Sequence, residues 1–412
     1  MRTLLWAILA ATLSLQAQPK LQRFTLPNGL RVLHLEDHER PLIRARLQLR
    51  LEPTDTPPGR QGLPRLIMRM LSRSDAADLK AEDFDRTLED SGIQLTHSLE
   101  RGGLSWQLVA RSRDQDRALG LLADRLLRTV FEPSILEAQR LACGQDAEQG
   151  DASAQVRLRA ALVEAPDSEP TVTSLGAITL EDLLAFRARV FRPDRAVLVL
   201  HGDLGLEQAK RLVLLSLGSW TAQEPLPSVK PPRIGAPAHS TLLSKGLSRV
   251  TVPGLGLRVQ AVAARPGDLP AEAASLLSLL VPGDAALTPV SLVMAEGYLV
   301  ATLDAETGAS GPGTWSLLHE RLDALRRRGF TQADLDRARS AWLAGRSLDS
   351  LHPEAQLDTT LAEARGLGVS EDHLRAMPLD TLNTGLRNWL DPARIRSGAA
   401  GDPERLKNLP KL

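Results

Sequence analysis

The stretch Ile178–Leu204, ITLEDLLAFRARVFRPDRAVLVLHGDL, carries the clearest structural signals in the chain. Its first part predicts a helix, and the Arg-Pro pair that begins at Arg192 predicts the turn that follows this helix. The apolar run that begins at Ala196 predicts a buried strand that ends in Gly-Asp at Gly202. We therefore expect a helix, a turn and a central strand in this order.

Strands and helices also alternate before this stretch. Residues 21–36, LQRFTLPNGLRVLHLE, predict a hairpin, because Asn-Gly is a preferred two-residue turn. Residues 42–52 alternate apolar and polar side chains as a strand does, and residues 63–72 have the spacing of a helix. Residues 92–111, GIQLTHSLERGGLSWQLVAR, predict a second hairpin. This mixed order predicts the α+β class, with a mostly antiparallel sheet and helices packed on it.

Two helical segments match each other at a constant offset of 199 residues. The matching pairs are Leu119 with Leu318, Asp124 with Asp323, Leu126 with Leu325, Arg128 with Arg327, Phe131 with Phe330, Leu136 with Leu335 and Arg140 with Arg339. Such a period predicts a duplicated domain of about 200 residues.

A Pro-rich segment separates the two copies. The sequence AQEPLPSVKPPRIGAP begins at Ala222 and has no helical or strand periodicity, so it predicts an extended linker. We therefore predict two similar domains, at 18–221 and 241–412, joined by a linker at 222–240.

The first 17 residues have the pattern of a secretory signal peptide. Arg2 precedes an apolar run from Thr3 to Leu15, which is short for a membrane span, and Ala17 ends a plausible cleavage site. We expect cleavage after Ala17 and a periplasmic or secreted mature chain that does not enter the membrane. An uncleaved N-terminal anchor is the alternative.

Composition excludes several classes of function. The 412 residues include 50 Lys and Arg and 50 Asp and Glu, so the net charge is zero and nucleic-acid binding is disfavoured. Cys143 is the only cysteine, which excludes an intramolecular disulfide and a multi-cysteine metal site. We expect Cys143 to be a buried, unreactive thiol on an amphipathic helix.

Together and in this order, these segments resemble the insulinase/pitrilysin/mitochondrial processing peptidase family of zinc metallopeptidases. The resemblance runs from about Leu21 to Leu406 and is strongest in the opening stretch, with its helix, Arg-Pro turn and strand ending in Gly-Asp. Two similar domains joined by a linker are also the architecture of this family. The resemblance implies a zinc site on a helix of the first domain.

The family's zinc motif is lost in this chain. Active members carry H-x-x-E-H, whose two histidines bind zinc and whose glutamate activates the metal-bound water, and a distant glutamate completes the metal shell. The corresponding residues are Arg65, Met68 and Arg69, and the distant position falls at or beside Gln145. Guanidinium groups stay protonated and repel a cation. We therefore expect no zinc, no other cofactor and no catalytic residues here.

By this resemblance, the family's substrate-gripping Arg/Tyr pair is also lost. In the stretch SLVMAEGYLVATL, aligning Gly297 with the family glycine places the arginine position near Val293 and the tyrosine position at Val300. Neither side chain can hydrogen-bond a substrate.

Three histidines imitate functional residues. HLEDH, from His34 to His38, resembles a metal motif, but on an extended strand the two imidazoles would lie about 13 Å apart. We expect surface histidines there, and we expect His201 to be structural.

Arg65 and Arg69 suggest a further hypothesis. Their charges could replace that of zinc by pairing with acids on the distant helix, such as Asp146 or Glu148. The competing interpretation is a solvent-exposed helix face or a subunit contact.

The main functional hypothesis is a non-catalytic partner of an active zinc peptidase of the same family, which helps to shape a chamber for extended peptides. The alternative is a stand-alone homodimeric peptide-binding or scaffold protein. Residual metallopeptidase activity is the weakest hypothesis.

Overall fold

The computed structural model describes most of the chain, and the account below concerns this part. The described residues are 21–52, 55–100, 103–148, 158, 162–164, 170, 172–222, 241–242, 248–251, 257–264, 269–282, 284, 287–295, 298–304, 311–349, 352–364, 368–406 and 409. The expected signal peptide, nearly all of the expected linker and Gly297 lie outside these residues.

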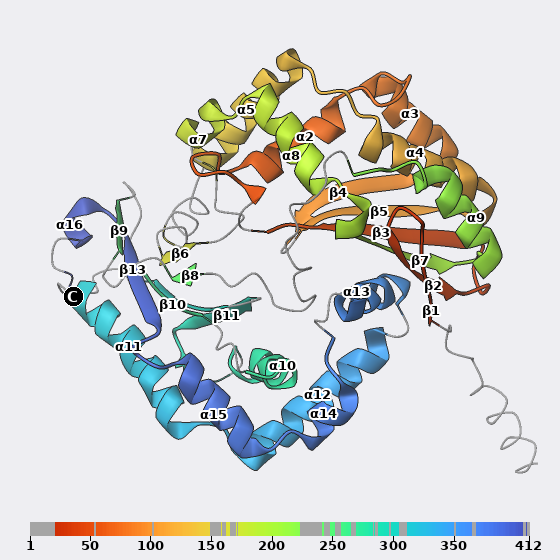
Figure 1. The fold of residues 1–412 in the computed structure, drawn as a ribbon. Helices are drawn as coiled ribbons and strands as arrows, with labels where there is room; N and C mark the ends of the chain where they lie inside the picture. Colours follow the sequence, from red (N-terminus) through yellow and green to blue (C-terminus); the bar gives the residue numbers. More distant parts are fainter. Residues whose placement is uncertain are drawn as a thin grey trace, which may run out of the picture.

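The first half forms a six-stranded sheet in the order β1-β2-β7-β3-β5-β4 (Figure 1). All neighbouring strands are antiparallel except β2 and β7, which are parallel. The strands are β1 Leu21–Thr25, β2 Arg31–Glu36, β3 Leu42–Arg50, β4 Gln94–Glu100, β5 Gly103–Arg111 and β7 Ala196–Gly202. Every residue of β7 is buried, as the apolar run of the opening stretch predicts.

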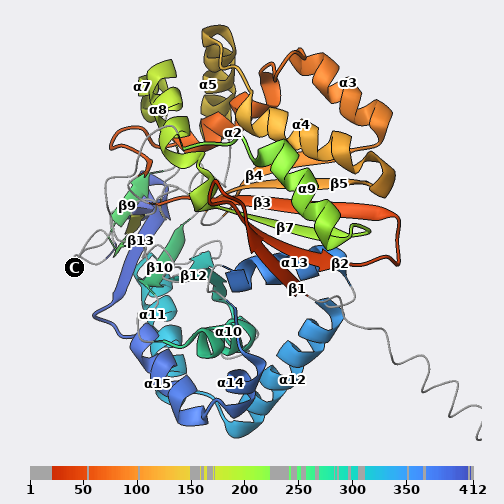
Figure 2. The same cartoon turned by 45° about the vertical axis from the view of Figure 1, so that its right-hand side comes forward.

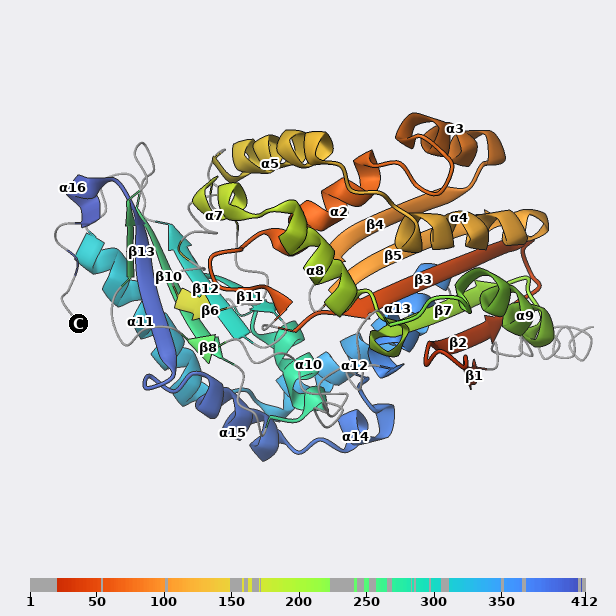
Figure 3. The same ribbon diagram turned by 45° about the horizontal axis from the view of Figure 1, so that its top comes forward.

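Helices cover one face of this sheet (Figure 3). They are α2 Leu63–Arg73, α3 Ala81–Ser91, α4 Gln115–Leu127, α5 Pro133–Glu148, α7 Val172–Ala177, α8 Leu180–Val190 and α9 Leu206–Leu217, with the 3-10 turns η2 Ser112–Asp114 and η3 Pro193–Arg195. The largest side chains of the core between sheet and helices are Trp106, Phe84 and Phe186, all fully buried. Burial of this apolar face is the main stabilising contribution to the first half.

The second half repeats this architecture with five strands in the order β11-β12-β10-β13-β9. Its strands are β9 Ser248–Thr251, β10 Arg258–Ala264, β11 Ser291–Ala295, β12 Tyr298–Asp304 and β13 Ile395–Gly401. Its helices are α10 Ala271–Leu280, α11 Gly311–Arg328, α12 Gln332–Asp349, α13 Pro353–Ala364, α14 Glu371–Ala376, α15 Leu379–Trp389 and α16 Pro403–Leu406. A short ribbon of β6 Val163–Glu164 and β8 Thr241–Leu242 lies between the sheets in Figure 1.

The two halves are structural copies, as the sequence period predicts. The offset of 199 residues also relates the first residues of α5 and α12, of α7 and α14, of α8 and α15, and of β7 and β13. Even individual hydrogen bonds recur: Arg140 donates to the carbonyl of Ile178, and Arg339 donates to the carbonyl of Met377. The α+β fold of two similar, mostly antiparallel domains is therefore confirmed.

Helix α13 belongs to the second half but packs on the first sheet (Figure 2). It lies on the face of that sheet that the helices of the first half leave uncovered. It contributes Leu357 and Leu361 to an apolar cluster with Leu33, Val197 and Val199. The strands β2 and β7 are therefore buried on both faces, and the two halves share one interface.

Ion pairs extend this interface towards β3. Arg44 pairs with Glu354 at 3.1 Å, and Arg46 pairs with Asp358 on the same helix. The Arg46 side chain is only 11% exposed and also binds Glu100 at 2.7 Å.

None of the helices in the described part of the chain combines the length and apolar character needed to span a bilayer.

Candidate functional site

Helix α2 carries the positions of the lost zinc motif. It begins after Gly62, whose φ of 92° lies in the left-handed region and whose added Cβ would come within 2.5 Å of Pro170 Cβ. One face of α2 packs into the core, and Met68 on it is 5% exposed. Arg65 and Arg69 lie one turn apart and are only partly buried.

Helix α5 packs against α2 and carries the distant position. Asp146 forms an ion pair with Arg69, as the charge-replacement hypothesis requires. Gln145 is exposed and makes no hydrogen bond among the described residues. Glu148 is the last residue of α5, and its side chain lies outside the described part of the structure. The site is therefore bridged by a guanidinium and a carboxylate.

Cys143 lies one turn before this pair and is 1% exposed. Burial raises the pKa of its thiol, although the charges of Arg69 and Arg65 oppose this effect. A thiol with a raised pKa is a poor nucleophile at neutral pH, so the expectation of a buried, unreactive cysteine holds.

The residues at these positions do not fit a divalent zinc ion. Two guanidiniums offer no lone pair to a metal, and a buried thioether with one neutral amide oxygen is a weak ligand set. Within the described ranges, no three His, Cys, Asp or Glu side chains are placed so that they could hold a metal ion.

His97 belongs to this site and is not singled out by the sequence. Strand β4 turns this side chain towards α2, where its Nε2 lies 2.9 Å from the carbonyl oxygen of Met68 and 2.7 Å from Ser72 Oγ. Burial lowers the pKa of His97, so the neutral form is favoured. The alternating pattern of β4 is the only signal that could have placed His97 beside α2.

The two positions of the lost substrate pair lie directly opposite each other. Val293 on β11 is the register partner of Val300 on β12, at the edge of the second sheet. Val300 is 7% exposed and has no hydrogen-bonding group in its side chain.

The expectation of a surface histidine at His34 is wrong. His34 is fully buried and its Nε2 donates to the carbonyl of Leu204 at 2.7 Å, because β2 lies inside the sheet. His38 is exposed, as expected, and hydrogen bonds with Asp203 and Glu36 raise its pKa. His201 is 2% exposed, and burial lowers its pKa, which agrees with a structural role.

Comparisons with known proteins agree with this geometry. Residues 177–264 match the family model described as peptidase M16 inactive domain, and a comparison with curated proteins found no match. A protease from Helicobacter pylori superposes with a TM-score of 0.77 at 14% identity, over 93% of this chain and 99% of its own. The peptidase M16 inactive domain from Pseudomonas fluorescens superposes with a TM-score of 0.74 at 18% identity, over 93% and 98% of the two chains.

A larger protein shares the fold over half of its length. The periplasmic protease PqqL from Escherichia coli superposes with a TM-score of 0.67 at 14% identity, over 93% of this chain but 48% of PqqL. At such identities these structures show a common fold. The family match over residues 177–264 and the shared fold together support a degenerate member of the M16, or insulinase, peptidase family. Its coarse functional class is that of a non-catalytic peptidase homologue.

The Arg69–Asp146 pair makes a modest contribution to stability. Its side chains are 36% and 51% exposed, so water screens their attraction. We expect Arg69→Leu to lower the free energy of unfolding by about 0.3–1 kcal/mol. This corresponds to about 1–4 °C in thermal midpoint, measured by circular dichroism. Asp146→Asn should have a similar effect, and the double variant should lose little more. An unchanged midpoint in both single variants rejects charge replacement at this site.

Proposed function

We propose that this chain is a non-catalytic partner subunit of an active zinc peptidase of its own family, and that it helps to form a chamber for extended peptides. The observation that carries the proposal is the two-domain fold around a motif in which two arginines and a methionine replace the hydrolytic residues. A fold kept without its chemistry still offers surfaces for peptides and for a second subunit.

The length of PqqL supports an assembly of two chains. This chain superposes on 48% of PqqL, and on 93% of the separately solved first half of that protein. One polypeptide of PqqL therefore contains about twice the structure that this chain contributes. A second two-domain chain, bearing the intact motif, supplies the remaining half in our proposal.

Strand β4 provides the surface for peptides. It is an edge strand of the first sheet, and it lies beside α2 and the lost zinc motif. Thr96 and Ser98 are exposed on the sheet face opposite the helical layer. An edge strand presents unpaired backbone groups that can bind an extended peptide as an additional strand.

The first 17 residues support a proposal for the cell compartment. Their cation, apolar run and small residue at the end predict export, and PqqL, which shares the fold, is described as periplasmic. We propose that the chain acts in the periplasm.

The subunit proposal is tested by purification from the native periplasm. We expect a tagged full-length chain to recover a family member with an intact H-x-x-E-H motif at about equal molar amount, and to contain no stoichiometric zinc itself. A stable homodimer in size-exclusion chromatography, without such a protein, instead supports the homodimeric scaffold. Stoichiometric zinc and chelator-sensitive peptide cleavage by the isolated chain would establish the third hypothesis.

Peptide binding at β4 is tested separately. We expect Thr96→Lys combined with Ser98→Lys to weaken binding of a pool of fluorescein-labelled decapeptides at least five-fold, because charged side chains on an edge strand oppose strand addition. Fluorescence anisotropy measures this change. Thr25→Lys on β1, the opposite edge of the sheet, is the matched control and should bind as the parent does. Equal weakening by both changes rejects β4 as the site.

A further inference from the structure

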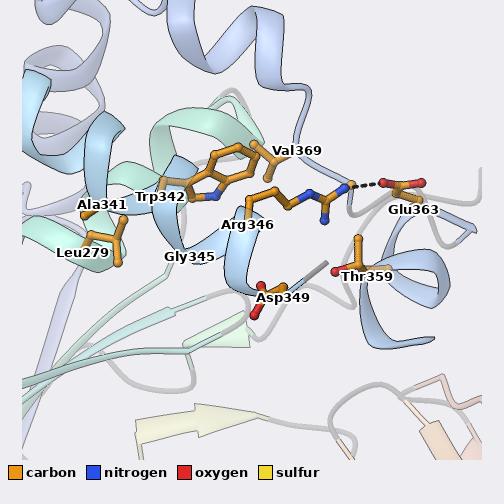
Figure 4. A pocket seen from close by; sticks show the side chains of 11 residues that line it. Leu279, Ala341, Trp342, Gly345, Arg346, Asp349, Thr359, Glu363 and Val369 are labelled. Carbon is orange, nitrogen blue, oxygen red and sulfur yellow. Dashed lines mark hydrogen bonds and ion pairs between the residues drawn. The ribbon is translucent and has the colours of Figure 1, made fainter. Parts of the chain in front are cut away.

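A cavity of about 290 Å³ lies in the second half, away from the lost zinc motif (Figure 4). Its walls come from α10, α12 and α13 and from the residues that precede α14. Trp342, Leu279 and Val369 supply apolar surface, whereas Arg346, Asp349 and Glu363 supply charge. This volume suits one long side chain or a small molecule, since pockets for drug-sized ligands span roughly 300–1,000 Å³.

Helix ends make the cavity electronegative. The last turns of α10, α12 and α13 all contribute to its lining, through Leu279, Arg346, Asp349, Ala362 and Glu363. The last carbonyl groups of a helix have no partner within that helix. Each such end acts as about half a negative charge. Three helix ends therefore favour a cation at the same place.

The charged side chains act in the same direction. Glu363 pairs with Arg346 at 2.8 Å, and this pair joins α12 to α13 (Figure 4). Asp349 is exposed and makes no ion pair with any described residue. The lining thus contains two carboxylates and one guanidinium, which leaves one negative charge without a partner.

The apolar part of the lining is also exposed. Leu279 is 45% exposed, and Trp342 is only partly buried. The Arg346 guanidinium lies 6.0 Å from the indole centroid, at the outer limit for a cation over an aromatic ring. The indole face can therefore accept a closer cation.

We propose that this cavity binds an ammonium or guanidinium group on an aliphatic stem, as in a lysine or arginine side chain of a bound peptide. The cation lies near Asp349 and the helix ends, and the stem lies against Leu279 and Trp342. That the cation belongs to a peptide rests on the proposed function, in which this chain binds extended peptides. Binding of the isolated side chain can be measured without the partner or the β4 edge.

A second cavity provides the contrast. It measures about 540 Å³ and lies on the helical layer of the first half, with Arg128 and Arg187 in its lining and no carboxylate. A cationic ligand should avoid it. Gly120 lines this second cavity, and Gly345 lines the first; an added Cβ at either position meets nothing within 4 Å. We therefore expect leucine at either helical position to fill its own cavity, and leucine favours a helix more than glycine does.

The test is calorimetric titration of the full chain with three blocked amino acids: Nα-acetyl-arginine amide, Nα-acetyl-norleucine amide and Nα-acetyl-glutamate amide. We expect the arginine derivative to bind at least ten-fold more tightly than the other two. Asp349→Asn should weaken its binding about five-fold, Gly345→Leu should abolish it, and Gly120→Leu should leave it unchanged. Equal binding of the norleucine derivative, or unchanged binding to Gly345→Leu, overturns the proposal. The variant with Thr96→Lys and Ser98→Lys should lose peptide binding at β4 but still bind the arginine derivative in this cavity. This result would show that the two sites are independent.

Discussion

Alanine at position 202 is expected to prevent the first half from folding, or to lower its free energy of unfolding by more than about 4 kcal/mol. Gly202 ends the central strand β7 with a φ of 126°, which side-chain-bearing residues rarely adopt. A Cβ there would lie 2.1 Å from the carbonyl oxygen of Leu42 and 3.1 Å from Ile43 Cα. Both atoms belong to the neighbouring strand β3, so the clash can be relieved only by separating two central strands.

Urea denaturation followed by circular dichroism measures this effect. Gly120→Ala is the matched control, because Gly120 lies in helix α4 and an added Cβ meets nothing within 4 Å. Alanine there should raise the free energy of unfolding by up to about 1 kcal/mol. If Gly202→Ala unfolds within about 0.5 M urea of the parent midpoint, the close approach of Gly202 to β3 does not limit stability.

Replacing Leu357 and Leu361 together with alanine is expected to uncouple the two halves. Both leucines are at most 4% exposed and hold α13 on the first sheet, whereas alanine preserves the helix but removes most of the apolar contact. A buried Leu→Ala change costs about 2–5 kcal/mol, so the pair should cost about 4 kcal/mol or more. Differential scanning calorimetry should then show two separated transitions, because the halves lose their shared cluster and unfold separately.

Two leucines on α9 serve as the control. Leu214 and Leu215 are 49% and 74% exposed, so their joint replacement with alanine should change stability by no more than about 0.5 kcal/mol. The ion pairs of Arg44 and Arg46 with α13 remain in the test variant. A single unshifted transition in the Leu357/Leu361 variant would mean that these ion pairs, and not the apolar cluster, hold the halves together.

Several elements could be predicted because their signals are local. The continuous apolar run from Ala196 requires a strand buried on both faces, and β7 is such a strand. Thr331 directly precedes α12, and its Oγ1 accepts a hydrogen bond from the backbone N–H of Asp334, as the side chain of a helix N-cap residue does. The 199-residue repeat can be found by comparing the sequence with itself. In the structure the same offset also relates the strands β7 and β13.

Other features could not be predicted, because they depend on segments far apart in the chain. His34 is assigned to the surface from its acidic neighbours, but the position of β2 between β1 and β7 buries it. His97 reaches α2 only because β4 is the edge strand beside that helix. Nothing near Leu357 indicates that α13 crosses to the sheet of the other half.

The chemical identity of the replaced motif can be read directly from the residues. Two guanidiniums offer no lone pair to zinc, and a thioether with a neutral amide is a weak ligand set in any fold, because these are properties of the side chains themselves. Whether Arg69 meets Asp146, how much water reaches that pair, and which helix ends surround Trp342 are set by the packing of distant helices. Long-range packing depends on the sum of many weak contacts, and no short stretch of sequence contains that sum.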